Sequence, residues 1–274
     1  MEGDLGKNLA DIYLQLNFRQ KLFLRYFCYP PPGRAISATD TSLVSESEPL
    51  GMLKHYFDNY FIQSIKDKVV LDIGCGGGSQ VLGIAKEGAK YAIGSEVRPI
   101  FEKAENRAKN LGIADRVKFT ISPLKELGES SIDIAFSQNS FEHFLTPEKI
   151  LNDVAYVLKK NGRFFITFGP PWLHPYGIHM AMMTKYPWAH VLFSENTIMA
   201  VRKLYKNDNA SRFEEVEGGL NQMTIKKFIR LCKNSGFSIE KLFLTPVKGL
   251  SPLIKIPFIR EFFTSHVSAV LVKE

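Results

Sequence analysis

A glycine-rich loop that follows an apolar stretch is the part of this chain best suited to hold a ligand. The apolar stretch ends in Asp72, the loop reads Gly74-Cys75-Gly76-Gly77-Gly78, and a helix-like segment follows at 79–86. Glycine has no Cβ and adopts positive φ easily, so a ligand can approach the backbone of this loop closely. The free N–H groups at the start of the following helix point toward that ligand. The pattern therefore predicts a site for a nucleotide-like molecule.

The spacing of the glycines disfavours two common nucleotide-binding motifs. A dinucleotide fingerprint would place its third glycine where this chain has Ser79. A phosphate-binding P-loop would end in Gly-Lys followed by Ser or Thr, and no lysine follows these glycines.

An acid follows the loop at the end of a second predicted strand. The run from 91 to 97 is apolar and contains Glu96 near its end. A carboxylate at this place can accept hydrogen bonds from both ribose hydroxyls of a nucleoside.

Three further strands are predicted downstream, and helical patterns separate them. They lie at 116–121, at 131–137 and after the turn Asn161-Gly162, with a helix expected from 147 to 160. Strands that alternate with helices indicate a parallel sheet. Ligands bind beyond the carboxyl ends of such strands, which is where the glycine loop and Glu96 are expected.

In this order, these elements resemble the motifs of the class I S-adenosylmethionine (SAM)-dependent methyltransferases. Leu71-Asp72 with the glycine loop is similar to motif I, and the stretch 138–143 is similar to the segment after the fourth strand. The resemblance implies an α/β fold: a Rossmann-like, seven-stranded, mostly parallel sheet with an antiparallel last strand and helices on both faces. It also implies an enzyme that uses SAM and releases S-adenosylhomocysteine, from the type 11-like, small-molecule branch.

The resemblance places the cofactor-binding residues in motif I, at the end of the second strand, and after the third and fourth strands. They are Asp72, Gly74, Cys75, Gly76, Gly78, Glu96, Val97, Leu124 and Gln138. Glu96 is the residue expected at the ribose.

One position departs from the family pattern. The family usually carries an Asp after the third strand that binds the adenine amino group, and this chain has Pro123 there. Adenine recognition is then expected from backbone groups, from Ser122, or from packing against Leu124 and Val97.

The segment after the fifth predicted strand concentrates reactive side chains. Trp172, His174, Tyr176 and His179 lie in a stretch that contains three prolines. Loops held on a rigid scaffold often carry function. A similar Gly-Pro-x-Trp stretch occurs in bacterial methyltransferase-like proteins.

Three roles are open for the histidines: general base, metal ligand and structural residue. We predict His179, His174 and His143 as catalytic residues. Glu142, Trp172 and Tyr176 are predicted to bind the substrate. A divalent metal held by His143, Glu142, His174 and His179 is compatible with the residue types but is not favoured, so no metal site is predicted.

A small-molecule acceptor is favoured over nucleic acid, with O- or N-methylation ahead of C-methylation. The net charge of +7 comes from Lys and Arg spread along the chain, without a long basic run. Amino-methyltransferases of DNA and RNA typically carry Asn/Asp-Pro-Pro-Tyr/Phe after the fourth strand, where this chain has Gln138-Asn139-Ser140-Phe141. A repurposed SAM-fold binding protein and an RNA methyltransferase remain as alternatives.

The chain divides into an N-terminal helical cap (1–50) and a methyltransferase domain (51–274) with a lid insertion at about 169–222. A single amphipathic helix is expected over 5–29, ended by prolines. Two arrangements are open for it: it folds over the cofactor pocket, with Tyr26, Tyr29 and Arg34 as cap residues, or it only covers core surface.

Composition indicates one soluble α/β domain with additions. The chain has 274 residues, 45% hydrophobic and 23% charged, with no uninterrupted apolar run of membrane-spanning length. The absence of a signal peptide pattern and three scattered cysteines favour a cytoplasmic location. The apolar, proline-rich and basic segment 242–263 is expected to be a hairpin loop packed on the core, or else a weak contact to an anionic membrane. The sequence predicts no oligomeric state.

Overall fold

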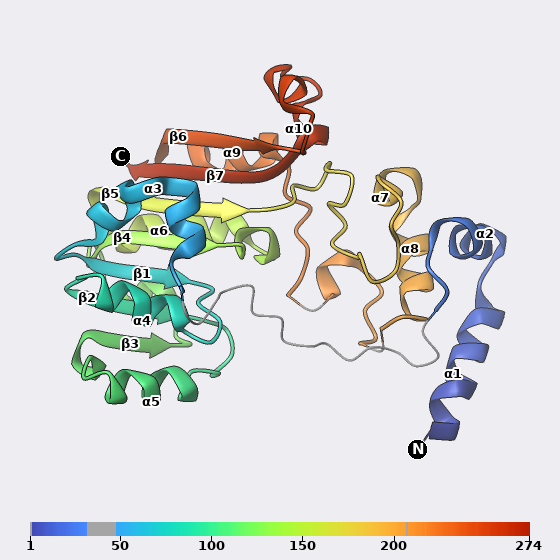
Figure 1. The fold of residues 1–274 in the computed structure, drawn as a ribbon, viewed down its shortest axis with the longest axis horizontal. Helices are drawn as coiled ribbons and strands as arrows, with labels where there is room; N and C mark the ends of the chain where they lie inside the picture. Colours follow the sequence, from blue (N-terminus) through green and yellow to red (C-terminus); the bar gives the residue numbers. More distant parts are fainter. Residues whose placement is uncertain (1, 32–47, 207, 217) are drawn as a thin grey trace.

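In the described part of the chain, seven strands form one sheet. The structure is a computed structural model that describes residues 2–31, 48–206, 208–216 and 218–274. The strands are β1 (Val69–Ile73), β2 (Tyr91–Ser95), β3 (Val117–Thr120), β4 (Ile132–Gln138), β5 (Leu158–Phe168), β6 (Phe237–Pro246) and β7 (Thr264–Lys273). Their order across the sheet is β3-β2-β1-β4-β5-β7-β6 (Figure 1).

Strands β1 to β5 are parallel, and β7 runs antiparallel between β5 and β6. The central strands are apolar on both sides because helices cover both faces of the sheet. This topology confirms the predicted seven-stranded, mostly parallel fold. The carboxyl ends of the parallel strands share one edge, on the right of the sheet in Figure 1.

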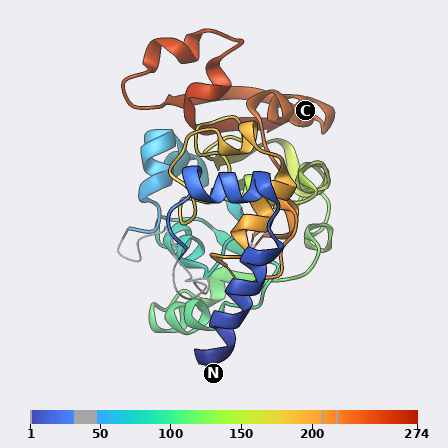
Figure 2. The ribbon, with the colours of Figure 1, turned by 90° about the vertical axis from the view of Figure 1, so that its right-hand side faces the viewer.

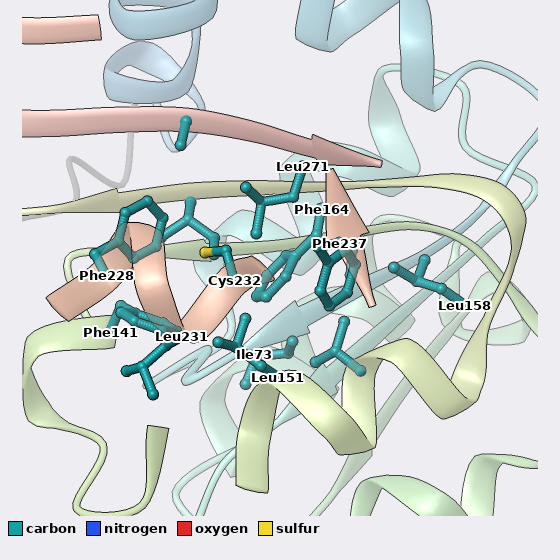
Figure 3. Close-up of a cluster of buried hydrophobic side chains, with 14 of the residues drawn as sticks. Ile73, Phe141, Leu151, Leu158, Phe164, Phe228, Leu231, Cys232, Phe237 and Leu271 are labelled. Carbon is teal, nitrogen blue, oxygen red and sulfur yellow. The ribbon is translucent and has the colours of Figure 1, made fainter. Parts of the chain in front are cut away.

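Two hydrophobic clusters attach the helices to the sheet. The helices α3 (Gly51–Ile65), α4 (Ser79–Lys86) and α5 (Glu102–Asn110) pack on one face. The helices α6 (Pro147–Val157) and α9 (Ile225–Asn234) pack on the other, where Phe228, Leu231 and Cys232 of α9 meet Phe164 and Phe237 of the sheet (Figure 3). The Thr224 side chain caps α9 by accepting a hydrogen bond from the Lys227 N–H.

The start of the fifth strand differs from the prediction. The preceding helix ends at Val157 rather than at 160, and β5 begins at Leu158, which pairs with Ile132 of β4. The backbone bends within the strand at Asn161 (φ 62°). At Gly162 an added Cβ would lie 2.8 Å from the Lys159 carbonyl oxygen. The Asn161-Gly162 turn therefore lies inside β5 rather than before it.

The N-terminal segment forms two helices instead of one. The helices α1 (Glu2–Gln15) and α2 (Phe18–Phe27) are separated by Asn17, whose side chain caps α2. Helix α2 packs against α8 (Glu195–Arg202) of the insertion, in a third cluster that contains Phe23 and Ile198. Together with α7 (Ala189–Leu192), these elements form a lobe beyond the carboxyl edge of the sheet (Figures 1 and 2). We call residues 2–31 and 169–222 the lid lobe.

Two of the three expected cap residues can be placed. Tyr26 and Tyr29 are exposed on the lid lobe, and α2 lies apart from the glycine loop between β1 and α4 (Figure 1). Arg34 lies outside the described residues. Helix α2 contributes to the lid through its contacts with α8 rather than by folding over the cofactor loop itself.

Residues 247–263 form an excursion between β6 and β7 that protrudes at the top of Figure 1. It contains a 3₁₀ turn (Ser251–Lys255) and α10 (Arg260–Phe263), and a hydrogen bond from the Val247 N–H to the Phe263 carbonyl closes its base. None of its side chains is fully buried. The expected hairpin loop packed on the core is therefore wrong for this segment. Within the described ranges, none of the helices combines the length and hydropathy of a membrane span.

Candidate active site

The glycine loop leaves an open cradle at its centre and packs tightly at its end. Gly74, Gly76 and Gly78 all have positive φ. A Cβ added at Gly76 or at Gly77 would meet no atom within 4 Å, whereas one at Gly78 would lie 2.5 Å from the Phe119 ring. The backbone at Gly76 and Gly77 is therefore accessible to a ligand, and Gly78 is required by packing.

Glu96 connects the second strand to this loop. Its Oε2 accepts a hydrogen bond from the Gly76 N–H at 3.0 Å, and its Oε1 accepts one from the Val97 N–H at 2.7 Å. Each carboxylate oxygen can accept a second hydrogen bond. The carboxylate is thus held in place with acceptor capacity left for ligand hydroxyls.

Asp72 is a buried carboxyl group that lacks a hydrogen-bond partner in the described part of the chain. Burial raises its pKa well above the ordinary value, and the charge of Glu96 raises it further. Buried polar groups in folded proteins are normally hydrogen-bonded. The unpartnered Asp72, the open glycine backbone and Glu96 together fit a ligand that carries hydroxyl and ammonium groups, as SAM does.

The other predicted cofactor residues differ in burial and in the face of the sheet on which they lie. The Cys75 thiol is buried on the α3–α4 side of the sheet, and Val97 is exposed at the sheet edge. The Leu124 side chain is buried in the cluster on the opposite face, with α6 and α9. Its side chain is thus part of the core, and only its backbone remains free to approach a cofactor.

Gln138 ends β4 beside the cofactor loop. Its Oε1 accepts a hydrogen bond from Gln80 Nε2 at 2.9 Å, and its own amide donates to the Met52 sulfur at 3.5 Å. Gln138 therefore joins α4 and α3 at the edge of the site. Met52 was not predicted as a site residue, because α3 precedes every motif identified in the sequence.

Ser140 was also missed by the sequence reasoning. Its hydroxyl donates to the Gly74 carbonyl at 3.3 Å, and an added Cβ at Gly74 would lie 2.8 Å from it. Ser140 therefore docks the segment after β4 directly on the glycine loop. Its position in a polar run at the end of a predicted strand was the available signal.

A small pocket lies between the segment after β4 and the lid lobe. It is lined by Glu142, Pro170, Trp172, Gly177, His179, Leu220, Gln222 and Met223. Glu142 is buried: its Oε1 accepts from the Gly169 N–H at 3.1 Å, and its Oε2 has no partner among the described residues. Burial raises the pKa of this carboxyl group.

The hydrogen bonds of His179 and His143 determine which ring nitrogen carries the lone pair. His179 Nε2 donates to the Pro170 carbonyl at 3.1 Å, so Nδ1 is the basic nitrogen. His143 Nδ1 donates to the Gly219 carbonyl at 2.7 Å, so its basic nitrogen is Nε2. The two rings lie 5.7 Å apart at 83°. Burial lowers the pKa of His179 to about 4, which keeps it neutral near pH 7.

His174 is arranged differently from these two. Its Nδ1 accepts a hydrogen bond from the Tyr176 N–H at 3.0 Å, so its lone pair is already used. The Tyr176 side chain is exposed, whereas Trp172 lies in the pocket and its carbonyl accepts from His190 Nε2. The structure therefore brings His143, His179, Glu142 and Trp172 together and leaves His174 and Tyr176 as a separate pair. No group of three or more metal-ligating side chains is assembled within the ranges that the structure describes.

His266 and Tyr56 reach the same edge of the sheet, although neither was selected from the sequence. Their rings stack at 4.2 Å and 9°. An added Cβ at Gly169 would lie 2.7 Å from His266 Nδ1. The pair is therefore next to Gly169, whose N–H donates to Glu142. His266 arrives here because β7 is antiparallel and starts where the parallel strands end.

Comparison with known proteins agrees with this geometry. A family model described as a methyltransferase domain matches residues 64–206, slightly more than half of the chain. Among curated proteins, the chain is 31% identical over 147 residues to protein arginine N-methyltransferase 1 of Saccharomyces cerevisiae. The aligned region covers 44% of this chain and 40% of the relative. It is 32% identical over 99 residues to a sterol 4-C-methyltransferase of Caenorhabditis elegans, which covers 35% of this chain and 29% of the relative. The chain thus spans less than half the length of either relative.

A solved structure extends the similarity to the fold. Geranyl diphosphate methyltransferase in complex with SAM aligns with a TM-score of 0.56, 13% sequence identity, and coverage of 83% of this chain and 86% of that one. The three proteins act on different acceptors, so the similarities do not select one.

Proposed function

This chain belongs to the family of class I SAM-dependent methyltransferases, and we propose that it methylates an oxygen or nitrogen of a small-molecule acceptor. The acceptor would bind in the pocket between the segment after β4 and the lid lobe. The observation that carries this proposal is the pairing of His179 Nδ1, a neutral base, with the unpartnered Glu142 Oε2 in one pocket.

The cofactor end of the site supports binding of SAM through three groups. The backbone at Gly76 and Gly77 leaves room for the ligand, Glu96 offers its free lone pairs to ribose hydroxyls, and Asp72 offers a buried carboxyl to polar hydrogens. When bound, SAM supplies a methyl group made electrophilic by its sulfonium.

The pocket residues support removal of the acceptor proton. In the proposed step, Nδ1 of His179 would take the proton from the acceptor O–H or N–H. The acceptor atom would bond to the methyl carbon while the bond from that carbon to the SAM sulfur breaks, so that S-adenosylhomocysteine is released. Glu142 Oε2 accepts a hydrogen bond that orients the acceptor. A positioned general base typically contributes about 10²–10⁴-fold to such a step.

The lining of the pocket supports a small-molecule acceptor. Trp172, Leu220 and Met223 provide apolar walls that exclude water from the reacting atoms. Alignment and desolvation are the main requirements of methyl transfer, and this pocket offers both.

Transfer of labelled methyl from SAM to a fractionated cell extract tests the proposal. We expect the label in the small-molecule fraction, insensitive to RNase and protease. A nuclease- or protease-sensitive product would overturn the acceptor class. Binding of S-adenosylhomocysteine without any label transfer would instead identify a repurposed binding protein.

A further inference from the structure

Helix α2 presents an apolar stripe to solvent as well as a buried face. Phe23 and Leu24 pack into the lid lobe, whereas Phe18, Leu22 and Tyr26 lie four residues apart on the outer face. The Phe18 side chain is 80% exposed. The same helix carries Arg19, Lys21 and Arg25 and no acidic residue.

Helix α7, a neighbour of α2, also exposes apolar side chains. Val191 and Leu192 of that helix are exposed, and Leu192 is 65% exposed. The adjoining Phe193 ring lies 4.9 Å from Phe27 of α2 at their centroids, so the two helices are neighbours.

The excursion between β6 and β7 extends this surface further. Phe258 is 91% exposed, and Lys248 and Lys255 are exposed beside it. The Phe263 ring at its base lies 6.4 Å from Trp188, which directly precedes α7. The excursion, α7 and α2 follow one side of the molecule in Figure 1, and in Figure 2 α2 faces the viewer with the excursion above it.

We call this surface the rim and define it by Phe18, Leu22, Tyr26, Val191, Leu192 and Phe258. Large apolar side chains grouped on one side of a protein mark a binding surface. Cations interleaved with aromatic and aliphatic side chains match an anionic bilayer interface, where the rings enter the headgroup region and the cations meet lipid phosphates. We propose that the rim docks the protein on an anionic membrane surface.

Vesicle flotation with the full chain tests this proposal. Vesicles of phosphatidylcholine with phosphatidylglycerol should carry the protein, vesicles of phosphatidylcholine alone should carry little, and added salt should weaken binding. Phe258→Glu and Phe18→Glu should each lower the partition coefficient. Lys255→Glu should lower it by about five-fold or more, because a basic residue near an anionic surface contributes on the order of 1 kcal/mol.

Matched controls come from the opposite end of the molecule. Leu111→Glu, after α5, and Lys118→Glu, in β3, alter exposed side chains remote from the rim and should leave partitioning unchanged. Equal binding to neutral and anionic vesicles, or no binding, would overturn the proposal. It would also be overturned if sedimentation showed a dimer that Phe18→Glu dissociates, without vesicle binding, because the rim would then join two copies of the chain.

Discussion

The backbone N–H of Gly76 donates to Oε2 of Glu96 at 3.0 Å, so the glycine loop is joined to the end of β2. The second carboxylate oxygen is held by the Val97 N–H. Both oxygens therefore have fixed positions, and a nucleoside meets a preorganised acceptor rather than a mobile side chain. Preorganisation of this kind lowers the entropy lost on binding.

Replacing Glu96 with Gln should weaken cofactor binding by about ten- to hundred-fold. One side-chain oxygen becomes an NH₂ group that faces a backbone N–H, and the charged hydrogen bonds, worth about 1.5–3 kcal/mol, are lost. Isothermal titration with S-adenosylhomocysteine measures the change. Glu102→Gln, an exposed acid at the start of α5, is the control and should bind as the unmodified chain does. Equal affinities for the two variants would remove Glu96 from the site.

Valine substitutions at Gly76 and Gly78 should separate ligand binding from stability. At Gly76 an added Cβ meets no protein atom, so Gly76→Val should lose S-adenosylhomocysteine binding with a modest fall in Tm caused by its positive φ. At Gly78 the Cβ would meet Phe119 at 2.5 Å and Ala104 at 2.9 Å. Gly78→Val should therefore unfold at a much lower temperature.

Differential scanning calorimetry and titration on both variants check this contrast. If Gly76→Val bound the ligand normally, the open side of the loop would not be the cofactor cradle. If the two variants had the same Tm, the packing difference between these glycines would be wrong.

His179→Asn should reduce turnover by about 10²–10⁴-fold and leave S-adenosylhomocysteine affinity nearly unchanged. Asparagine tolerates the positive φ of 56° at this position but cannot act as a base near pH 7. His174→Asn is the matched control, because the His174 lone pair is already occupied by the Tyr176 N–H. The control should lower stability more than turnover. Parallel losses of turnover and ligand affinity in His179→Asn would indicate a structural role.

The parts of the fold that the sequence predicted depend on local patterns. Apolar runs that end in Asp72 or near Glu96 identify strands and their carboxyl ends, and the order of the motifs determines the sheet. Thr224 likewise marks a helix start through a bond to its own backbone neighbour. Each of these features needs only residues close together along the chain.

The parts that the sequence missed depend on contacts between distant segments. Phe23 and Ile198 are far apart in the chain, so no local pattern shows that α2 packs on α8 instead of over the glycine loop. His174 and His179 have similar surroundings in the sequence, and only the acceptor or donor that each ring meets shows which of them keeps a free lone pair. His266 was missed because its ring stacks on Tyr56 of α3, which is far from β7 along the chain.

The stacked pair of Tyr56 and His266 predicts a specific pH dependence of stability. Burial, and secondarily the nearby His55, lowers the pKa of His266 to about 4, against an ordinary value of about 6.5 in the unfolded chain. Between these values the unfolded state binds a proton that the folded state does not, so this group's contribution to stability is complete above pH 6.5 and falls as the pH drops toward 4.

His266→Phe keeps a ring against Tyr56 and removes the titrating group. Urea unfolding at pH 7.5 and 4.5 should therefore show the unmodified chain losing about 2 kcal/mol more than this variant. His55→Phe, which alters an exposed imidazole, is the control and should lose as much unfolding free energy between the two pH values as the unmodified chain. If His266→Phe lost the same amount as both, His266 would have the same pKa in the folded and the unfolded chain.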